Sequence, residues 1–305
     1  GETQDQFDIT HTYGPTAADQ VPYNPAFAKG KHRTLASGFV QDIWDVLPNL
    51  RFSAGARYDR YSDFGNTFNP RAGFNWEFLD GYILRFSYGT SFRAPTFGET
   101  GGTNAALLGN INLQPEMIST NEIGFIANPI QGLSTSITAF DSTISNMIRY
   151  SAGGYTNSGG ATSQGVEIET KYYYSDASYL AVNYTLQKVQ DAMTQQDLRN
   201  VPNHFGNVML NQELVSNISL LTHVFIKGDV TPSAVPSVPI ASYALLNSTL
   251  LAKDVVKDVT LSASVYNWLD TVYYDPAQYS HKASGWQGNL PTPERSVFIR
   301  ASFKY

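Results

Sequence analysis

The 305-residue chain contains no cysteine, which excludes a disulfide framework and every form of thiol chemistry. Charged residues are scarce, at 15% of the chain against about 25% in an average soluble domain. The chain also lacks a run of about 18 apolar residues, so the sequence offers no candidate for a transmembrane helix. Tyrosine and phenylalanine are abundant instead, with 19 and 17 residues.

The charge balance and the missing motifs narrow the possible functions. Acidic residues outnumber basic ones by 26 to 20, whereas nucleic-acid binding requires a basic surface. The sequence has no Gly-x-Ser-x-Gly elbow, no His-Glu-x-x-His zinc motif and no phosphate-binding loop. His204 and His223 lie on neighbouring segments, but the pattern leaves the face of each open. We expect no nucleic-acid partner, no cofactor, no metal site and no enzymatic activity.

Apolar and polar residues alternate with a period of two along most of the chain. In the stretch LRFSAGARY, Leu50, Phe52 and Tyr58 share one parity, and arginine and serine occupy the other. Side chains alternate across a strand, so each such segment has one apolar and one polar face. About thirteen segments of this kind occur, most of them near the 9–11 residues of a tilted membrane strand. They lie near 33–45, 49–61, 69–78, 82–93, 117–127, 132–149, 162–175, 178–190, 204–214, 217–229, 242–252, 257–268 and 294–305.

The last segment keeps this pattern to the final residue. Val297, Ile299, Ala301, Phe303 and Tyr305 share one parity, and arginine, lysine and serine lie between them. An aromatic residue at the end of such a strand resembles the assembly signal of outer-membrane proteins. We therefore expect the last two aromatics to bind the barrel assembly machinery and the apolar face to meet lipid.

The connections between the segments alternate in length. Short links such as FLDGY and YSDAS alternate with long ones, among them 93–116, 150–161, 190–203, 229–241 and 269–293. Short turns at one end of the strands and long loops at the other are typical of an outer-membrane β-barrel. We predict an all-β fold, an antiparallel up-and-down transmembrane barrel in the bacterial outer membrane. Residues 1–32 are expected to form an extracellular loop or N-terminal segment, and 33–305 the barrel.

An odd strand number bears on whether the barrel is complete. An up-and-down barrel closes with antiparallel neighbours only when its strand count is even. With about thirteen strands, we expect a partial barrel whose remaining strands lie upstream or on another chain.

Five motifs, in this order, resemble TonB-dependent outer-membrane receptors. They are SYGTSFRAPTFGE at 87–99, NINLQPEMISTNEIGF at 110–125, SQGVEIE at 163–169, RNVPNH at 199–204 and VYNWLDTVYY at 265–274. The resemblance covers the C-terminal part of that family's barrel, and residues 33–80 fit it in alternation only.

The resemblance implies a barrel of about 22 strands, closed by an N-terminal plug domain that lies outside this sequence. It further implies active import of a scarce small ligand, most often a ferric siderophore, with energy supplied through TonB. Cobalamin and haem receptors of the same family are alternatives, as are a passive porin-like channel and a structural or adhesive surface barrel. Haem is disfavoured because the family's haem receptors are similar in carrying a histidine where the stretch 96–109 has none.

The resemblance also implies contact residues. Lumen-facing Glu122, Glu167, Glu169 and Arg93 are expected to contact the plug, because a buried carboxylate requires a partner. Solvent or the inward-facing arginines of neighbouring strands are the alternative partners of the glutamates, namely Arg51, Arg57, Arg71 and Arg85. Loop aromatics are expected to stack on a planar ligand, with packing on one another as the alternative. These aromatics are Tyr150, Tyr155, Tyr274, Tyr279 and Trp286.

Overall fold

The protein is described by a computed structural model that covers residues 6–13, 32–104, 107–151, 153–232, 238–276 and 289–303, with the backbone alone at 6–13, 103, 104 and 107. None of the helices in these ranges is long and apolar enough to cross a membrane.

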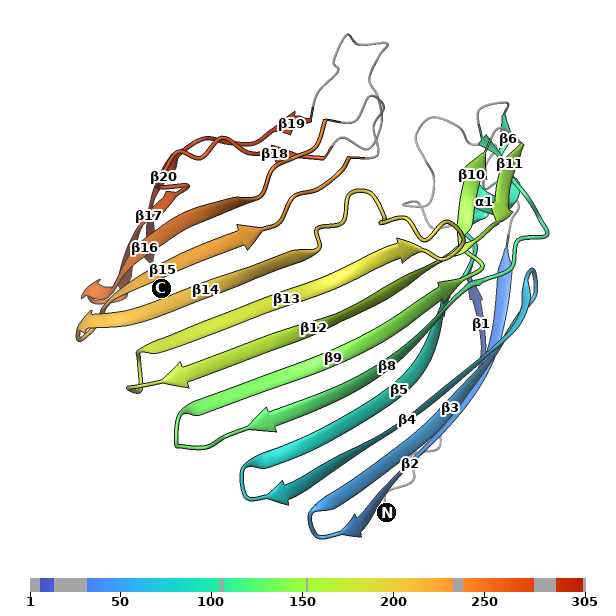
Figure 1. Cartoon of the computed structure of the whole chain (residues 1–305), viewed down its shortest axis with the longest axis horizontal. Coiled ribbons are helices and arrows are strands. Elements are labelled where there is room, and N and C mark those ends of the chain that lie inside the picture. The colour runs from blue at the N-terminus through green and yellow to red at the C-terminus, as the bar shows by residue number, and fades with distance from the viewer. Residues whose placement is uncertain are drawn as a thin grey trace. The chain divides into compact units, whose positions relative to one another are not determined.

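Fourteen strands of the described chain form one sheet, in the order β1-β2-β3-β4-β5-β8-β9-β12-β13-β14-β15-β16-β17-β20 (Figure 1). Their bounds are β1 Gln6–Tyr13, β2 Arg33–Leu47, β3 Leu50–Tyr61, β4 Gly65–Leu79, β5 Tyr82–Arg93, β8 Glu116–Ala127, β9 Leu133–Ser145, β12 Gly160–Tyr173, β13 Tyr179–Asp191, β14 His204–Val215, β15 Ile218–Lys227, β16 Tyr243–Val256, β17 Val259–Tyr266 and β20 Ser296–Phe303. Smaller elements lie in the long connections. These are α1 Phe97–Gly101, β6 Thr103–Asn104, β7 Leu107–Leu108, β10 Ile148–Ser151, β11 Gly154–Asn157, β18 Tyr274–Asp275 and β19 Leu290–Pro291.

Each of the thirteen predicted segments coincides with a strand of the sheet, so the all-β prediction is confirmed. The structure adds β1, which pairs antiparallel with β2 inside the region 1–32 that we expected to be a loop or terminal segment. The odd strand count was therefore wrong, because the described sheet has fourteen strands, and the expectation of a partial barrel does not depend on that count. The predicted segment 132–149 also divides in two, because Asn146 has a left-handed φ of 56° that ends the extended chain after β9.

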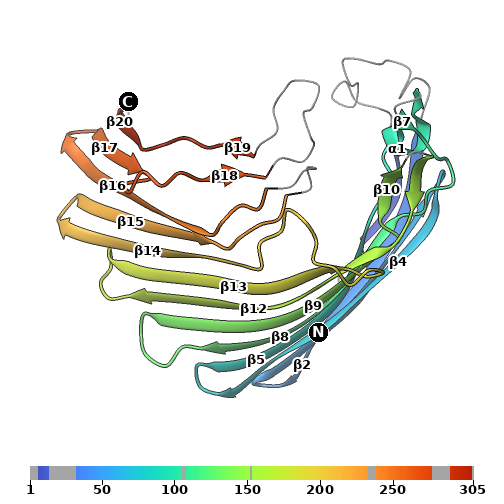
Figure 2. The ribbon, with the colours of Figure 1, turned by 45° about the horizontal axis from the view of Figure 1, so that its top comes forward.

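The chain divides into two compact units. Unit 1 comprises Gly1–Gly124, Phe140–Gln164 and Gln190–Gln196, and unit 2 comprises Phe125–Ala139, Gly165–Val189 and Asp197–Tyr305. In unit 1, α1 and β10 lie together beyond the ends of the long strands (Figure 2). In unit 2, β18 and β19 lie beyond the ends of β16 and β17 (Figure 2).

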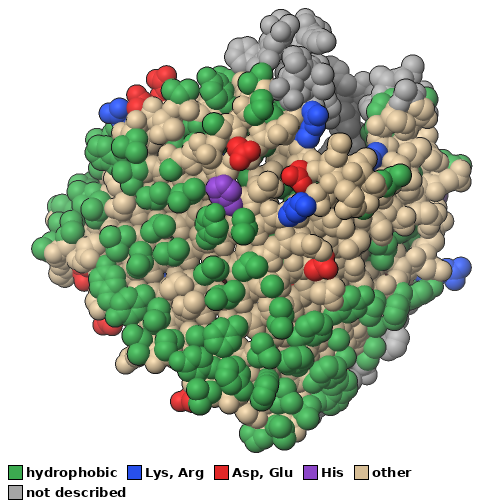
Figure 3. All heavy atoms as spheres, in the orientation of Figure 1, with side chains coloured by type: hydrophobic (Ala, Val, Ile, Leu, Met, Phe, Trp, Pro, Cys, Tyr) green, Lys and Arg blue, Asp and Glu red, His purple; other side chains and the backbone are tan. Residues whose placement is uncertain are grey.

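The strands of unit 1 expose apolar side chains on one parity. Trp44 is 41% exposed, Phe68 60% and Trp76 42%. Residues of the opposite parity are mostly polar in β3 and β4, and among them Asp59 and Thr67 are buried. Hydrophobic side chains cover much of the strand face that Figure 3 shows, with few charged ones among them. Exposed apolar and buried polar side chains invert the usual arrangement of a soluble protein and fit strands with lipid on one side.

Aromatic rings cluster beside the short turns of unit 1. The rings of Trp44 and Phe52 stack with their centroids 5.3 Å apart. Trp76 lies 5.7 Å from Phe78, which lies 6.4 Å from Tyr82. A belt of aromatic rings at strand ends is typical of a membrane–water boundary.

Unit 2 follows the same rule, with Leu210, Leu250 and Ile299 exposed on its apolar face. Two-residue turns join β14 to β15 and β16 to β17, and the second turn residue, Asn217 or Asp258, has a φ of 69° or 63°. Asparagine and aspartate tolerate this left-handed conformation, which the tight turns of β-hairpins require. The register that these turns set places Asn207, His223 and Asn247 on the opposite face of unit 2.

Candidate functional site

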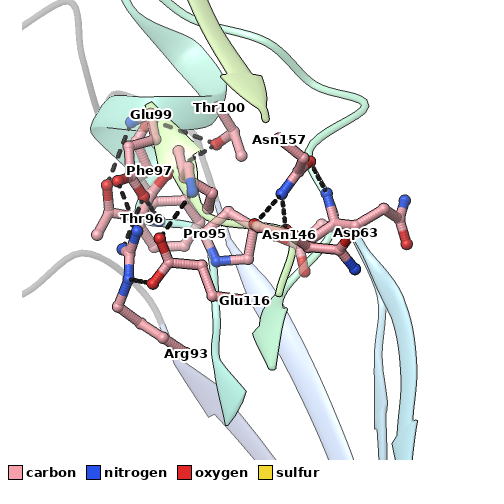
Figure 4. Close-up of polar contacts among 12 residues, drawn as sticks. Asp63, Arg93, Pro95, Thr96, Phe97, Glu99, Thr100, Glu116, Asn146 and Asn157 are labelled. Atoms are coloured by element: carbon pink, nitrogen blue, oxygen red, sulfur yellow. Dashed lines mark hydrogen bonds and ion pairs between the residues drawn. The ribbon is translucent and has the colours of Figure 1, made fainter. Parts of the chain in front are cut away.

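The long connections of unit 1 are joined by an arginine at the end of β5. Arg93 Nε donates to Glu116 Oε2 at 2.6 Å, and its terminal nitrogens donate to Glu99 at 3.1 Å (Figure 4). The other oxygen of Glu116 accepts the backbone N–H of Ile148 at 2.7 Å. One guanidinium group therefore links the end of β5 to α1, to the start of β8 and, through Glu116, to β10.

The motif SYGTSFRAPTFGE, which contains Arg93, also contains the start of α1. Thr96 Oγ1 accepts the N–H of Glu99 at 3.2 Å, and Glu99 Oε2 accepts the N–H of Thr96 at 2.7 Å, which completes a capping box. Arg33 holds this turn from β2, since its guanidinium donates to the carbonyl of Pro95 at 2.6 Å and lies 5.1 Å from the ring of Phe97. The Phe-Arg-Ala-Pro motif thus anchors a loop in this structure.

The motif at 110–125 is joined to the β10–β11 hairpin through Asn157. The side-chain amide of Asn157 donates to the carbonyls of Gln114 and Asn146, each at 2.8 Å, and its oxygen accepts the N–H of Gln114 at 2.8 Å (Figure 4). Tyr150 and Tyr155 are paired across this hairpin, with ring centroids 5.1 Å apart. The two tyrosines therefore pack on one another, and Tyr150 remains 43% exposed.

An ion pair ties this hairpin to the loop after β13. Arg149 donates to Asp191 at 2.7 Å, and the other Asp191 oxygen accepts the N–H of Thr194 and of Met193. Lys188 is exposed on the apolar parity of β13, so the apolar band has ended before Asp191. Hydrogen bonds from Thr194 and then from Arg149 lower the pKa of the Asp191 carboxyl to about 2.

Unit 2 contains an aromatic cavity of about 650 Å³ at the loop end of β16. We call it the tyrosine cavity. It is lined by Val238, Pro239, Ile240, Ala241, Ser242, Tyr243, Thr271, Val272, Tyr273, Tyr274 and Asn289. The rings of Tyr243 and Tyr273 lie 4.8 Å apart, and Lys227 Nζ lies 5.8 Å from the centre of the Tyr243 ring. Burial and, secondarily, the charge of Asp275 raise the pKa of Tyr243, which begins β16 on the loop side, to about 12.

One wall of the tyrosine cavity depends on the motif VYNWLDTVYY. The Asn267 side chain is buried, accepts the N–H of Thr271 and donates to its carbonyl, both at 2.9 Å. Asp270 accepts the N–H of Arg295 at 2.9 Å. Asn267 and Asp270 both have left-handed φ, at 53° and 55°. These residues shape the turn that leads into the tyrosines.

The predicted lumen glutamates lie on the polar parity. Glu122 alternates with exposed Ile123, and its Oε2 accepts the Ser87 hydroxyl at 2.7 Å. Glu167 and Glu169 are exposed, and the apolar Ile168 between them points to the opposite side. Three of the four arginines offered as alternative partners have other contacts, and Arg85 Nε is buried without a hydrogen-bond partner among the described residues. Arg57 binds Asp59, Arg51 binds Asp45, and Arg71 donates to Gln41.

The profile of the TonB dependent receptor-like β-barrel family matches residues 1–267. The chain belongs to this family. It is part of an outer-membrane TonB-dependent receptor barrel, which confirms the predicted family, fold and location. Membership of a receptor family also supports the expectation that the chain is not an enzyme.

Solved receptors share the fold of this TonB-dependent receptor barrel. The siderophore receptor PirA of Acinetobacter baumannii matches with a TM-score of 0.76 at 17% identity, over 96% of this chain and 48% of that one. A variant of the ferric enterobactin receptor of Pseudomonas aeruginosa matches with a TM-score of 0.76 at 18% identity, over 89% of this chain and 45% of that one. The chain thus spans less than half the length of these structures.

A relative found by sequence comparison is also an outer-membrane protein. An iron-regulated outer membrane virulence protein of Vibrio cholerae is 30% identical over 123 residues, which is 38% of the TonB-dependent receptor barrel described here and 19% of that protein.

Other predicted site residues of the receptor barrel stand as follows. Phe303 is exposed on the apolar face of β20. Tyr274 lines the tyrosine cavity, whereas Tyr279, Trp286 and Tyr305 lie outside the described residues. Neither the plug contacts nor the assembly signal are tested by this arrangement, so both stay predictions.

Sequence reasoning missed several site residues of the receptor barrel. Tyr243 is one of them, although an aromatic residue that opens a strand after a long loop is a usable signal. Arg149 and Asp191 are 42 positions apart, so no pattern within a short stretch of sequence indicates that they pair.

Proposed function

We propose that this receptor barrel belongs to an uptake receptor that imports a ferric siderophore across the outer membrane with TonB-coupled energy. The observation that supports this proposal best is the structural likeness to two siderophore receptors over about nine-tenths of the chain. The iron-regulated relative points to the same class of cargo. The remaining length of such a receptor leaves room for the plug domain and the coupling segment that the proposal requires.

The chemistry of the tyrosine cavity supports an organic ligand. Among the described residues its lining carries no charged side chain, and three tyrosines face it. A ring inserted between such side chains gains about 0.5–1.5 kcal/mol for each aromatic contact beyond its buried area. We therefore assign the cavity to the organic part of a siderophore, with Tyr274 and the Tyr150–Tyr155 pair as further loop contacts.

The plug contacts are the second part of the proposal. Glu122, Glu167 and Glu169 are oriented toward the polar face, where a plug would lie. Arg93 already holds two carboxylates, so its role is to fix the loops above the plug rather than to receive a free partner.

Uptake measurements test the proposed function. The intact gene would be expressed in cells with and without TonB, and uptake of ferric siderophores, cobalamin and haem would be compared. We expect uptake of one ferric siderophore, and at least tenfold less without TonB. Equal uptake in both backgrounds would indicate a passive pore, and TonB-dependent uptake of cobalamin or haem alone would show the cargo class to be wrong.

A further inference from the structure

A row of polar side chains crosses four neighbouring strands on the polar face of unit 2. We call it the asparagine–histidine chain, and it consists of the side chains of Asn183, Asn207, His223 and Asn247 and ends at the backbone of Asn267, which follows β17. Its successive hydrogen bonds join Asn183 Oδ1 to Asn207 Nδ2 at 3.0 Å, Asn207 Oδ1 to His223 Nε2 at 2.8 Å, His223 Nδ1 to Asn247 Nδ2 at 3.4 Å, and Asn247 Oδ1 to the backbone nitrogen of Asn267 at 2.8 Å.

The direction of every bond in this chain follows from its last member. The backbone N–H of Asn267 is only a donor, so the side-chain oxygen of Asn247 faces it and the NH₂ group of Asn247 faces His223. His223 Nδ1 must therefore accept and carry no proton. The neutral imidazole then has its proton on Nε2, which donates to Asn207. The register supports this geometry, since His223 lies directly opposite Asn247.

The chain ends at the wall of the tyrosine cavity. Asn247 holds the backbone of Asn267, whose buried side chain in turn holds both backbone groups of Thr271. Thr271 is followed directly by Val272, Tyr273 and Tyr274, which line the cavity. The other wall continues into β16, the strand that carries Asn247. The hydrogen bonds of His223 thus extend to the turn that positions two of the three cavity tyrosines.

We propose that neutral His223 is a positioning residue for the tyrosine cavity, acting through Asn247 and Asn267, so that acidification loosens the cavity wall. A second proton on the imidazole places an N–H on Nδ1, opposite the NH₂ group of Asn247. Two donors then face each other, and Asn247 turns away from His223 or from the Asn267 N–H. The functional consequence, weaker ligand binding at low pH, rests on the proposed function. The change in the wall itself does not.

The surroundings of His223 contain no nearer titratable partner among the described side chains of this face. On β14 it meets Asn207 and Met209, and on β16 it meets Asn247. The nearest charged groups are Lys227, four positions along β15 toward the cavity, and Glu213, opposite Ser219 at the other end of the strand. Tyr243 lies opposite Lys227. His223 is therefore the titratable side chain in direct contact with Asn247 on this face.

Hydrogen exchange in the intact receptor tests this inference without a ligand. Protection factors for the amides of Asn267 and Thr271, corrected for the intrinsic effect of pH, would be measured from pH 8 to pH 5. We expect about a fivefold loss of protection across this range, the size of one lost hydrogen bond. Protection that stays constant would overturn the proposal.

The variant Asn247→Asp sharpens the test because it exchanges one NH₂ group for an oxygen. Aspartate still accepts the Asn267 N–H, but it now accepts from a protonated Nδ1 instead of donating to it. We expect Asn247→Asp to keep its protection at pH 5, and His223→Phe to show low protection at every pH. An equal loss in Asn247→Asp and wild type would contradict the proposal.

His204→Phe is the matched control. His204 has the opposite parity and packs its ring 6.0 Å from Tyr184 on the apolar face, so we expect the same pH response as in wild type. Binding of ferric enterobactin to the same proteins supplies the functional arm. Its affinity should fall about fivefold in wild type from pH 8 to pH 5 and stay constant in Asn247→Asp. An absence of ferric enterobactin binding at every pH would show that the receptor takes another ligand, while the exchange data would still decide the inference.

Discussion

Single carboxylates on the loop side determine how the long connections of unit 1 are held. Glu116 and Glu99 share Arg93, and Asp191 combines Arg149 with two backbone N–H groups. Exposed ion pairs contribute about 0–1 kcal/mol, and hydrogen-bonded networks contribute more because each bond fixes the next group. We therefore attribute the order of these loops to the shared acceptors rather than to isolated charge pairs.

Asp191 gives a prediction about acid pH. Its pKa in the folded protein, about 2, lies below its ordinary value of 3.8, so the ionised form stabilises the loop. This contribution is complete above about pH 4 and is lost as the pH falls toward 2. We expect the amides of residues 193 and 194 to lose hydrogen-exchange protection over that window, measured by mass spectrometry with correction for intrinsic rates. In Asp191→Asn, protection should be lower and independent of pH in this range; an unchanged wild-type profile would refute the assignment.

At the scale of elements, alternation gives each strand its two faces, and close packing of backbones restricts some positions to glycine. Gly206 on β14 lies opposite Tyr184 on β13. A Cβ atom there would lie 2.6 Å from the carbonyl oxygen of Asn183 and 2.8 Å from the ring of Tyr184. Tyr184 therefore uses the space that the missing side chain leaves.

We predict that Gly206→Ala destabilises the barrel by about 1–3 kcal/mol, because backbone and ring must both move to admit the methyl group. Gly38→Ala on β2 is the control, since a Cβ atom there meets nothing within 4 Å. The measurement is urea unfolding in lipid, followed by the loss of heat-modifiable migration on gels. Equal stability of the two variants would argue against the close approach of β13 and β14.

Element prediction succeeded where a local rule was sufficient. The sequence predicted thirteen strands because the alternation of apolar and polar residues is visible within about ten residues and does not depend on distant parts of the chain. The stretch QFDITHTY of β1 also places Phe7, Ile9 and Tyr13 on one parity, so a signal was present. A single short segment after a polar start carries little weight without a partner strand, and the pairing of β1 with β2 is a tertiary fact.

At the scale of the whole molecule, the charged groups of the polar face are expected to find their partners in the rest of the receptor. The chain covers less than half the length of similar receptors. Glu122 bonds to a neutral serine in the described structure, and its charge is the feature that a basic plug side chain would complement.

We predict that Glu122→Arg in the intact receptor lowers TonB-dependent uptake at least tenfold, because two like charges would face each other at the plug. Glu122→Gln should have a smaller effect. The control is Glu213→Arg, which lies beside a short turn, and outer-membrane fractionation would confirm equal amounts of each protein. Normal uptake and normal plug seating in Glu122→Arg would refute the plug contact.

The sequence by itself determined thirteen of the fourteen strands of the described sheet, their two faces, the alternation of short and long connections, and the family. Each of these follows from neighbours within a few positions, because side chains alternate along extended backbone and turns are local. Only the tertiary structure decided which residues meet. Arg93 binds the carboxylates of Glu99 and Glu116, and the rings of Tyr150 and Tyr155 pack on one another. His223 bonds to asparagines on two neighbouring strands. Those contacts depend on strand register over tens of residues, and a shift of one position would reverse every face.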